Sequence, residues 1–241
     1  MNFIFTIFHE VLYRPLFNGL VFLYNVVPYH DFGIAIILLT LIIRFILYPL
    51  NQKALKSQKA LSELQPQIKE IQSKYKADRV KQSQALMDFY KTKGINPASG
   101  CLPLLVQLPV LIALYQVFLN GLKPESLKSL YYFVSRPELI NTKFLGLIDL
   151  SQSNYGLAIL AGALTFVQSK MMAPSTKSAN PGDFSTMMSR QMTYLMPIIT
   201  LIIAWKLPAG LALYWVVITL FGVVQQYFVN KKINESRIAK N

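Results

Sequence analysis

The 241-residue sequence contains one cysteine, two histidines and only 11 acidic residues, and each shortage excludes a class of protein. A single cysteine, Cys101, permits no internal disulfide. No GxxxxGK[ST], HExxH or CxxC motif occurs, and neither His9 nor His30 lies in a long apolar segment. The sequence therefore predicts no ATP hydrolysis, no metalloproteolysis, no serine protease with a buried histidine and no cofactor or metal site. We do not expect an enzyme.

Charged residues are also scarce. They make up 15% of the chain, whereas hydrophobic residues make up 53%. A typical soluble domain has about 25% charged residues, so this composition favours a polytopic membrane protein. The net charge of +13 would suggest nucleic-acid binding in a soluble protein, but here it first suggests basic loops on the cytoplasmic side of a membrane.

Five apolar segments are candidate membrane spans, each of which needs roughly 20 mainly apolar residues. They are residues 32–50, 101–119, 154–172, 191–205 and 208–229, of which 191–205 is the shortest. The intervening segments complete an all-α prediction: an outer amphipathic interfacial segment (1–31), a cytoplasmic helical hairpin (51–97), an extracytoplasmic loop (120–153), a cytoplasmic loop (173–190) and a basic cytoplasmic tail (230–241).

The positions of lysine and arginine predict the orientation of these spans. Seventeen of the 24 basic residues fall in segment 51–97, around loop 173–190 or in the tail, whereas six fall on the opposite side. Cytoplasmic loops of membrane proteins carry an excess of basic residues. We therefore expect a multi-pass protein of the cell membrane with its N-terminus outside and its C-terminus in the cytoplasm.

The first 31 residues do not resemble a signal peptide, because no basic residue precedes Arg14 and no cleavage site of small residues follows. Polar residues recur at helical spacing on one face, and leucines recur on another. The polar positions are Glu10, Arg14, Asn18 and Asn25. This pattern predicts an amphipathic helix in the outer membrane interface. A sixth span is the alternative, and it would place the N-terminus on the other side.

Segment 51–97 is polar and carries ten basic and four acidic residues. From Ala54 to Tyr75, small or apolar residues are spaced alternately three and four apart, and a second such seam runs from Val80 to Tyr90. A helix stop follows at Gly94. The segment therefore predicts an antiparallel helical hairpin. Its basic surface is either simply solvated or a contact for anionic lipid headgroups or ribosomal RNA.

Arg44 is the single charged residue inside segment 32–50. It lies six residues before Leu50, about 9 Å from the cytoplasmic end of the predicted span. Either its long side chain reaches the inner headgroups, or its guanidinium lies in a hydrated cavity within the bundle. Polar residues of other spans could line such a cavity: Gln107, Thr165, Gln168, Thr219, Gln225 and Gln226.

Several longer stretches resemble the YidC family of membrane protein insertases. They include LIIRFILYPL, LQPQIKEIQSKYKAD, GINPASGCLPLLVQLP, FLGLIDLS and LPAGLALYW, in the family's order. The resemblance implies five spans around a groove that opens to the cytoplasm and to lipid and is closed on the outer side. It also implies that Arg44 attracts the acidic part of a substrate, that Gln168 lines the groove, and that substrate helices leave past Tyr214 and Trp215.

The predicted function is therefore a membrane protein insertase and chaperone for proteins with short translocated tails. Its groove would contain Arg44, Gln107, Gln168, Tyr214, Trp215 and Thr219. The expected partners are nascent membrane proteins and the lipid bilayer, with the ribosome and the Sec translocon as further candidates. Two alternatives stay open: a small anion channel or transporter that uses Arg44 for selectivity, and a structural membrane subunit that docks a partner through the hairpin.

Overall fold

The computed structural model describes residues 3–96, 102–121, 126–172 and 184–238, which are mostly helical. An N-terminal helix consists of α1 (Phe3–Phe8), a π-helical turn (His9–Tyr13) and α2 (Arg14–Val26). The other helices are α3 (Phe32–Ile46), α4 (Tyr48–Lys74), α5 (Arg79–Thr92), α6 (Leu102–Gln116, continued by a π-helical turn, Val117–Gly121), α7 (Tyr155–Met172), α8 (Phe184–Lys206) and α9 (Ala209–Ile238). Two short antiparallel strands, β1 (Lys143–Phe144) and β2 (Ile148–Asp149), lie between α6 and α7.

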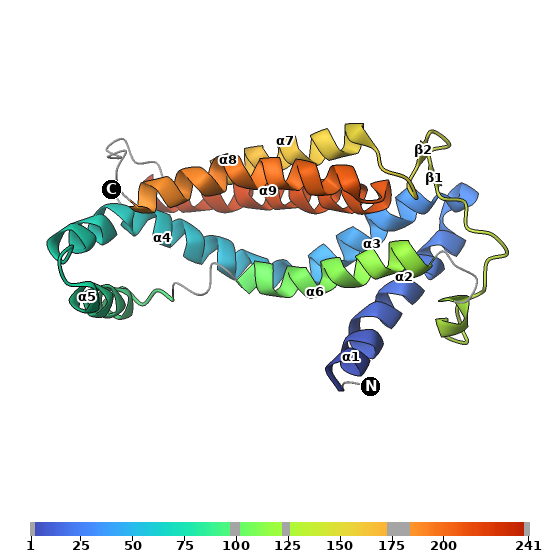
Figure 1. Ribbon diagram of the computed structural model, residues 1–241, viewed down its shortest axis with the longest axis horizontal. Helices are drawn as coiled ribbons and strands as arrows, with labels where there is room; N and C mark the ends of the chain where they lie inside the picture. The colour runs from blue at the N-terminus through green and yellow to red at the C-terminus, as the bar shows by residue number, and fades with distance from the viewer. Residues whose placement is uncertain (1–2, 97–101, 122–125, 173–183, 239–241) are drawn as a thin grey trace.

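Helices α7, α8 and α9 pack side by side, and α3 packs against α9 (Figure 1). Helices α4 and α5 extend from one end of this bundle, whereas the N-terminal helix and the β1–β2 loop lie toward the other (Figure 1). We refer to these as the α4–α5 end and the β1–β2 end. Helix α3, which contains Arg44, and helix α4 together run from the β1–β2 end to the α4–α5 end (Figure 1).

By length and apolar composition, one helix within the described residues could cross a membrane, Ala209–Lys232. The count rises to two if α3 and α4, which meet at an angle of 65°, form one broken span. Leu105–Leu119 and Thr193–Lys206 are apolar but shorter. The helical prediction is therefore confirmed, and the number of spans stays a prediction.

Helix α3 ends at Ile46, earlier than the predicted end of its span at residue 50, and α4 begins at Tyr48 rather than at residue 51. The cause is Pro49, which lies in the first turn of α4. Proline lacks a backbone N–H and its ring clashes with the preceding turn, so α3 cannot continue through it, whereas proline is well tolerated in the first turn of a new helix. The chain bends there, next to Arg44.

Helices α8 and α9 are longer than the apolar segments that predicted them. Helix α8 begins at Phe184 instead of residue 191, and α9 continues through the predicted tail to Ile238. Hydropathy reports where a segment stops being apolar, and no proline or glycine ends α9 at that point. Within the extension, Lys231 and Glu235 are spaced as an i,i+4 pair with their charged atoms 4.0 Å apart.

Asp78 starts α5, because its Oδ1 accepts hydrogen bonds from the backbone N–H groups of Val80 (3.1 Å) and Lys81 (3.0 Å). Gly94, with φ +64°, follows the end of α5, where the sequence predicts a helix stop. The predicted seam on α5 is not packed, since Val80 is 68% exposed and Met87 is 52% exposed. The first turns of α4 pack against the bundle instead, so only its distal part is near α5.

The N-terminal helix binds the loop between α6 and α7 through its polar face. An interfacial helix would turn this face to water, yet Asn18 is only 3% exposed. Its amide donates to the carbonyl of Ser129 (3.1 Å) and accepts from the N–H of Tyr131 (2.6 Å). Tyr24 bonds the same loop further along, at Leu139 and Asn141. These contacts satisfy loop backbone groups that would otherwise lack partners.

Replacing Asn18 by Leu should release this loop, because the substitution leaves the partly buried N–H of Tyr131 without an acceptor. Such an orphaned group costs about 1–3 kcal/mol. We expect faster amide hydrogen exchange over residues 129–135 in detergent micelles. The matched control is Asn25→Ala, which removes one bond, to the Ser135 carbonyl, at a more exposed position. Equal exchange in wild type and Asn18→Leu would show that Asn18 does not hold the loop.

Candidate functional site

Arg44 lies in the last turn of α3, beside the bend at Leu47. Its side chain is half-buried, and its Nε atom is buried with no hydrogen-bond partner among the described residues. No described carboxylate pairs with it either. A guanidinium that is held in apolar surroundings without a fixed anion attracts any anionic group that enters, since the surroundings screen the attraction less than water does.

Tyr214 and Gln107 complete a group that we call the Arg44 cluster, which consists of these three residues. Tyr214, on α9, is only 1% exposed. The side-chain amide of Gln107, on α6, donates a hydrogen bond to the Tyr214 hydroxyl. Arg44 is close enough to Tyr214 for the two side chains to interact electrostatically. Three helices, α3, α6 and α9, thus bring together three of the predicted groove residues.

Gln168 and Thr219 belong to a second contact, between α7 and α9. The side-chain amide of Gln168 lies against the backbone of Gly222, where a Cβ atom would come within 2.3 Å of its Nε2. Thr219, one turn before Gly222 on α9, is 4% exposed. No hydrogen bond within the described part of the chain joins these two side chains to the Arg44 cluster.

Trp215 follows Tyr214 directly in α9, so its side chain points about 100° away around the helix. It is partly buried and packs against the apolar core. Among the described residues, no polar contact connects it to Arg44. The structure therefore places Trp215 on a different side of α9 from the Arg44 cluster.

Asn51 and Gly222 are neighbours of the site that the sequence analysis did not single out. Asn51, in the first turn of α4, is only 7% exposed although it was assigned to a solvated hairpin. Nearby, Gln225 of α9 donates to the Tyr48 carbonyl (3.4 Å) and to Gln52 (3.3 Å). The sequence signal for the burial of Asn51 was Pro49. A helix that begins at this proline keeps its first turn, which contains Asn51, against the bundle. A glycine within an apolar span was the signal for Gly222.

The bundle is polar where α4, α7 and α9 meet. A cavity of about 10 Å³ lies there, enough for one water molecule. Polar side chains supply much of its lining: Gln58, Lys59, Ser62, Gln226 and Asn230. The Oε1 atom of Gln226 is buried without a hydrogen-bond partner within the described residues. This side of the site therefore offers polar groups to an entering chain.

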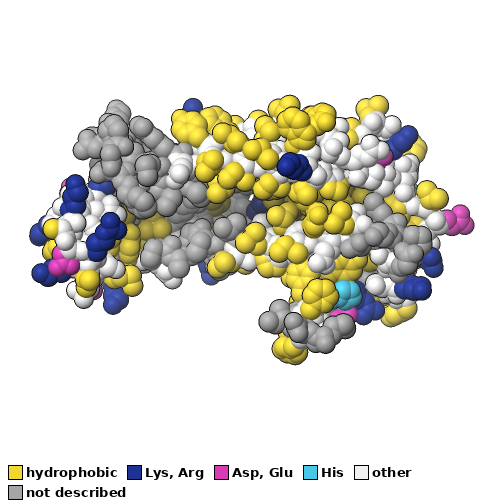
Figure 2. Space-filling view, in the orientation of Figure 1, with side chains coloured by type: hydrophobic (Ala, Val, Ile, Leu, Met, Phe, Trp, Pro, Cys, Tyr) yellow, Lys and Arg dark blue, Asp and Glu magenta, His cyan; other side chains and the backbone are white. Residues whose placement is uncertain are grey.

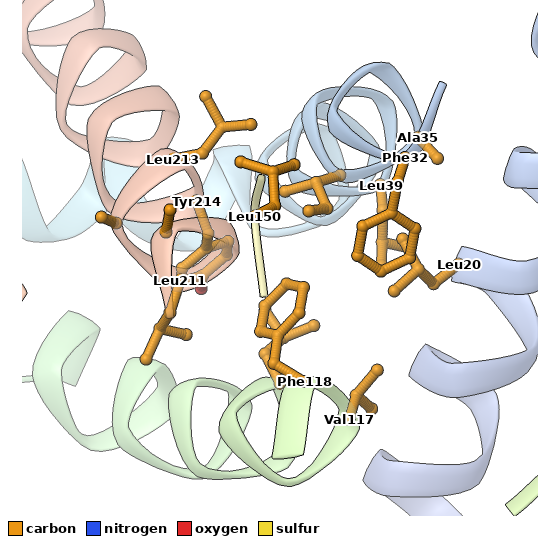
Figure 3. Packing of buried hydrophobic residues seen from close by; sticks show 14 of the residues in the cluster. Leu20, Phe32, Ala35, Leu39, Val117, Phe118, Leu150, Leu211, Leu213 and Tyr214 are labelled. Carbon is orange, nitrogen blue, oxygen red and sulfur yellow. The ribbon is translucent and has the colours of Figure 1, made fainter. Parts of the chain in front are cut away.

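Toward the β1–β2 end, the site is closed by apolar packing. Phe118, Leu211 and Leu150 are buried beside Tyr214, and Leu150 belongs to the loop that carries β1 and β2 (Figure 3). Phe118 packs edge-on against Phe32, with ring centroids 6.1 Å apart. The loop also caps α9, since the N–H groups of Ala209 and Gly210 donate to loop carbonyls at 2.7 and 2.9 Å.

The molecular surface has two kinds of region. Apolar side chains cover much of α6, α7 and α8, whereas lysine and arginine lie mostly toward the two ends of the molecule (Figure 2). Ile112, Ile159 and Ile198 are about half exposed or more, at 49%, 59% and 55%. An extended apolar exterior is rare on soluble monomers. Helices with this exterior are suited to contact with lipid.

Electrostatic attraction and hydrogen bonding are the chemistry that this site offers. In the part of the chain that the structure describes, no group of three or more His, Cys, Asp or Glu side chains could hold a metal ion. The arrangement is suited to binding a polar or anionic segment beside an apolar surface.

Comparison with known proteins covers nearly the whole chain. The family described as 60Kd inner membrane protein matches residues 22–236. The chain is 35% identical over 223 residues to the membrane protein insertase YidC of Fusobacterium nucleatum, which covers 92% of this chain and 98% of that protein. It is 37% identical over 204 residues to the protein of the same name from Oceanobacillus iheyensis, covering 83% of this chain and 75% of that protein. With the same-named protein of Lawsonia intracellularis, identity is 35% and covers 92% of this chain but 39% of that protein.

Proposed function

The chain belongs to the 60Kd inner membrane protein family, and from this premise we propose that it is a membrane protein insertase and chaperone of the cell membrane. It transfers nascent membrane proteins with short translocated tails from the cytoplasm into the bilayer and helps them fold. Partitioning, not a chemical reaction, drives this transfer. The observation that supports the proposal most strongly is the half-buried Arg44 with its unpartnered Nε, beside the polar groups of Tyr214 and Gln107.

In the proposed arrangement, α3, α6, α7, α8 and α9 are five spans. The α4–α5 end faces the cytoplasm, and the N-terminal helix lies in the outer interface above the β1–β2 end. The excess of basic residues at the α4–α5 end supports this orientation. The same basic residues make α4 and α5 the proposed contact for anionic lipid headgroups or for a ribosome beside the Sec translocon.

In the proposed mechanism, the acidic tail of a substrate enters from the cytoplasmic side and meets Arg44, while its apolar helix moves laterally into lipid. A substrate helix of about 20 residues gains roughly 6–12 kcal/mol on insertion, at about 0.3–0.6 kcal/mol per residue. One charge at mid-bilayer costs about 2.5–3.5 kcal/mol. Partitioning can therefore carry a tail with one or two charges, and Arg44 lowers the cost of a substrate carboxylate.

An anion channel would also use an unpaired arginine. It would in addition need a continuous polar path, yet Phe118, Leu211 and the loop residue Leu150 pack beside Tyr214 as buried apolar side chains. This apolar closure favours the insertase. The tail of a substrate crosses this apolar region only once, and the partitioning of the substrate's own apolar helix into lipid drives the crossing.

Photo-crosslinking distinguishes an insertase from a channel or a structural subunit. A photoreactive residue at position 168 should crosslink the apolar helix of a ribosome-bound nascent membrane protein. Ile159, 59% exposed and nine residues away on the opposite face of α7, is the matched control, and we expect weaker crosslinks from it during insertion. Equal crosslinking from both positions, or none from position 168, would count against a substrate path beside Gln168.

A further inference from the structure

Gly222 lies in α9 at the point where the side chain of Gln168, on α7, approaches that helix. A Cβ atom at this position would be 2.3 Å from Nε2, 3.4 Å from Cδ and 4.0 Å from Oε1 of Gln168. All three of its nearest neighbours therefore belong to one side-chain amide. That amide occupies the space that any other residue at position 222 would need.

The need for glycine here does not come from the backbone. Gly222 is inside a regular helix, where glycine is a poor helix former compared with alanine. Gly94 and Gly146 differ, because both have positive φ angles. Gly162 differs too: its Cβ would meet the Cβ of Leu201 and the backbone oxygen of Pro197, so it allows two helices to pack closely.

The amide of Gln168 also lies among the polar groups of α9. Thr219 precedes Gly222 by three residues and Gln225 follows it by three, so both are its neighbours on the helix surface. Both are buried, with 4% exposure each. The Gln168 amide thus meets α9 in a stretch that carries two buried polar residues, one on each side of Gly222.

We propose that Gly222 is a positioning residue, which sets the depth and orientation of the Gln168 amide in the substrate groove. This inference rests on the proposed function, because the groove is where the position of the amide matters. A methyl group at residue 222 would collide with the far end of a flexible side chain and not with backbone. It would therefore displace the amide while leaving the helices in place.

The test compares insertion by Gly222→Ala, Gln168→Ala and the double variant in liposomes, with a short acidic-tailed membrane protein as substrate. We expect each single variant to insert the substrate about three- to tenfold more slowly than wild type, which is the effect of one lost hydrogen bond. The double variant should be no slower than either single variant. The thermal midpoint of Gly222→Ala should equal or exceed that of wild type. Gly162→Ala, which meets backbone, should instead lower it.

A shorter side chain provides a rescue. Gln168→Asn retracts the amide by one methylene group and so makes room for the added methyl, so Gly222→Ala combined with Gln168→Asn should insert faster than Gly222→Ala alone. A merely structural role for Gly222 predicts no such rescue. The proposal would be overturned if the two single losses in insertion rate add up in the double variant, or if Gly222→Ala inserts the substrate at the wild-type rate.

A direct readout separates this inference from the proposed function. In protein with ¹⁵N-labelled glutamine side chains, the NH₂ signal that disappears in Gln168→Ala should shift in Gly222→Ala, whether or not the protein inserts substrates. An unshifted signal would refute the contact itself. If the signal shifts but the wild-type protein inserts no substrate, the contact between Gly222 and Gln168 stands and the proposed function is wrong.

Discussion

Reversing the charge of Arg44 should reduce insertion of acidic-tailed substrates by at least about tenfold and spare substrates with neutral tails. Two unit charges 4 Å apart interact by about 4 kcal/mol at an effective dielectric constant of 20. Arg44→Glu turns that attraction into repulsion, and about 1.4 kcal/mol already corresponds to tenfold. No described carboxylate pairs with Arg44, so the reversal breaks no ion pair among the described residues.

The matched comparison for Arg44 is Arg44→Lys. Lysine retains the charge but loses the planar fork that binds a carboxylate through two hydrogen bonds, so an intermediate rate is expected. The measurement is protease protection of the acidic-tailed and the neutral-tailed substrate, compared side by side for wild type, Arg44→Glu and Arg44→Lys. If Arg44→Glu slows the neutral substrate as much as the acidic one, then the arginine has a structural role and not an electrostatic one.

Truncating Tyr214 should have the largest effect on stability. Tyr214 is 1% exposed and contacts both the apolar closure and Gln107. Removing a buried aromatic ring costs about 3–5 kcal/mol. For a chain of this length, Tyr214→Ala should lower the thermal midpoint in detergent by roughly 6–20 °C.

Tyr214→Phe separates the ring from its hydroxyl. The ring remains and fills the same volume, so we expect a small change in the midpoint. The Gln107 amide loses its acceptor, however, and Arg44 loses a polar neighbour. Insertion should therefore fall more than stability does. A midpoint for Tyr214→Phe as low as that of Tyr214→Ala would contradict the assignment of stability to packing of the ring.

The helices that end at local signals could be predicted from the sequence, and the others could not. Helix α7 coincides with the apolar segment 154–172, and Asn154 is a local start signal, because it accepts from the Leu157 N–H (3.0 Å); that α7 spans a membrane stays a prediction. The break between α3 and α4 was also encoded locally, at Pro49, but hydropathy alone runs past it. The contacts of Asn18 depend on a loop more than 100 residues away, and no periodicity in the N-terminal helix could reveal them.

The same distinction applies to the candidate site. Arg44, Gln107 and Tyr214 were expected in one groove, and the structure brings them together; their role in binding substrates stays a prediction. The family resemblance implied one role for Tyr214 and Trp215 together, but adjacent residues on a helix point in different directions. Gly222 attracted no attention because it has no side chain, and its importance depends on what α7 places against it.

Insertion into liposomes tests the central claim most directly. A short single-span protein with an acidic N-terminal tail is added to empty vesicles, to vesicles with the wild-type protein and to vesicles with Arg44→Ala, and insertion is scored by protease protection. We predict protection well above empty vesicles with wild type and clearly less with Arg44→Ala. Protection by wild type no greater than in empty vesicles would contradict the proposal that this protein inserts membrane proteins.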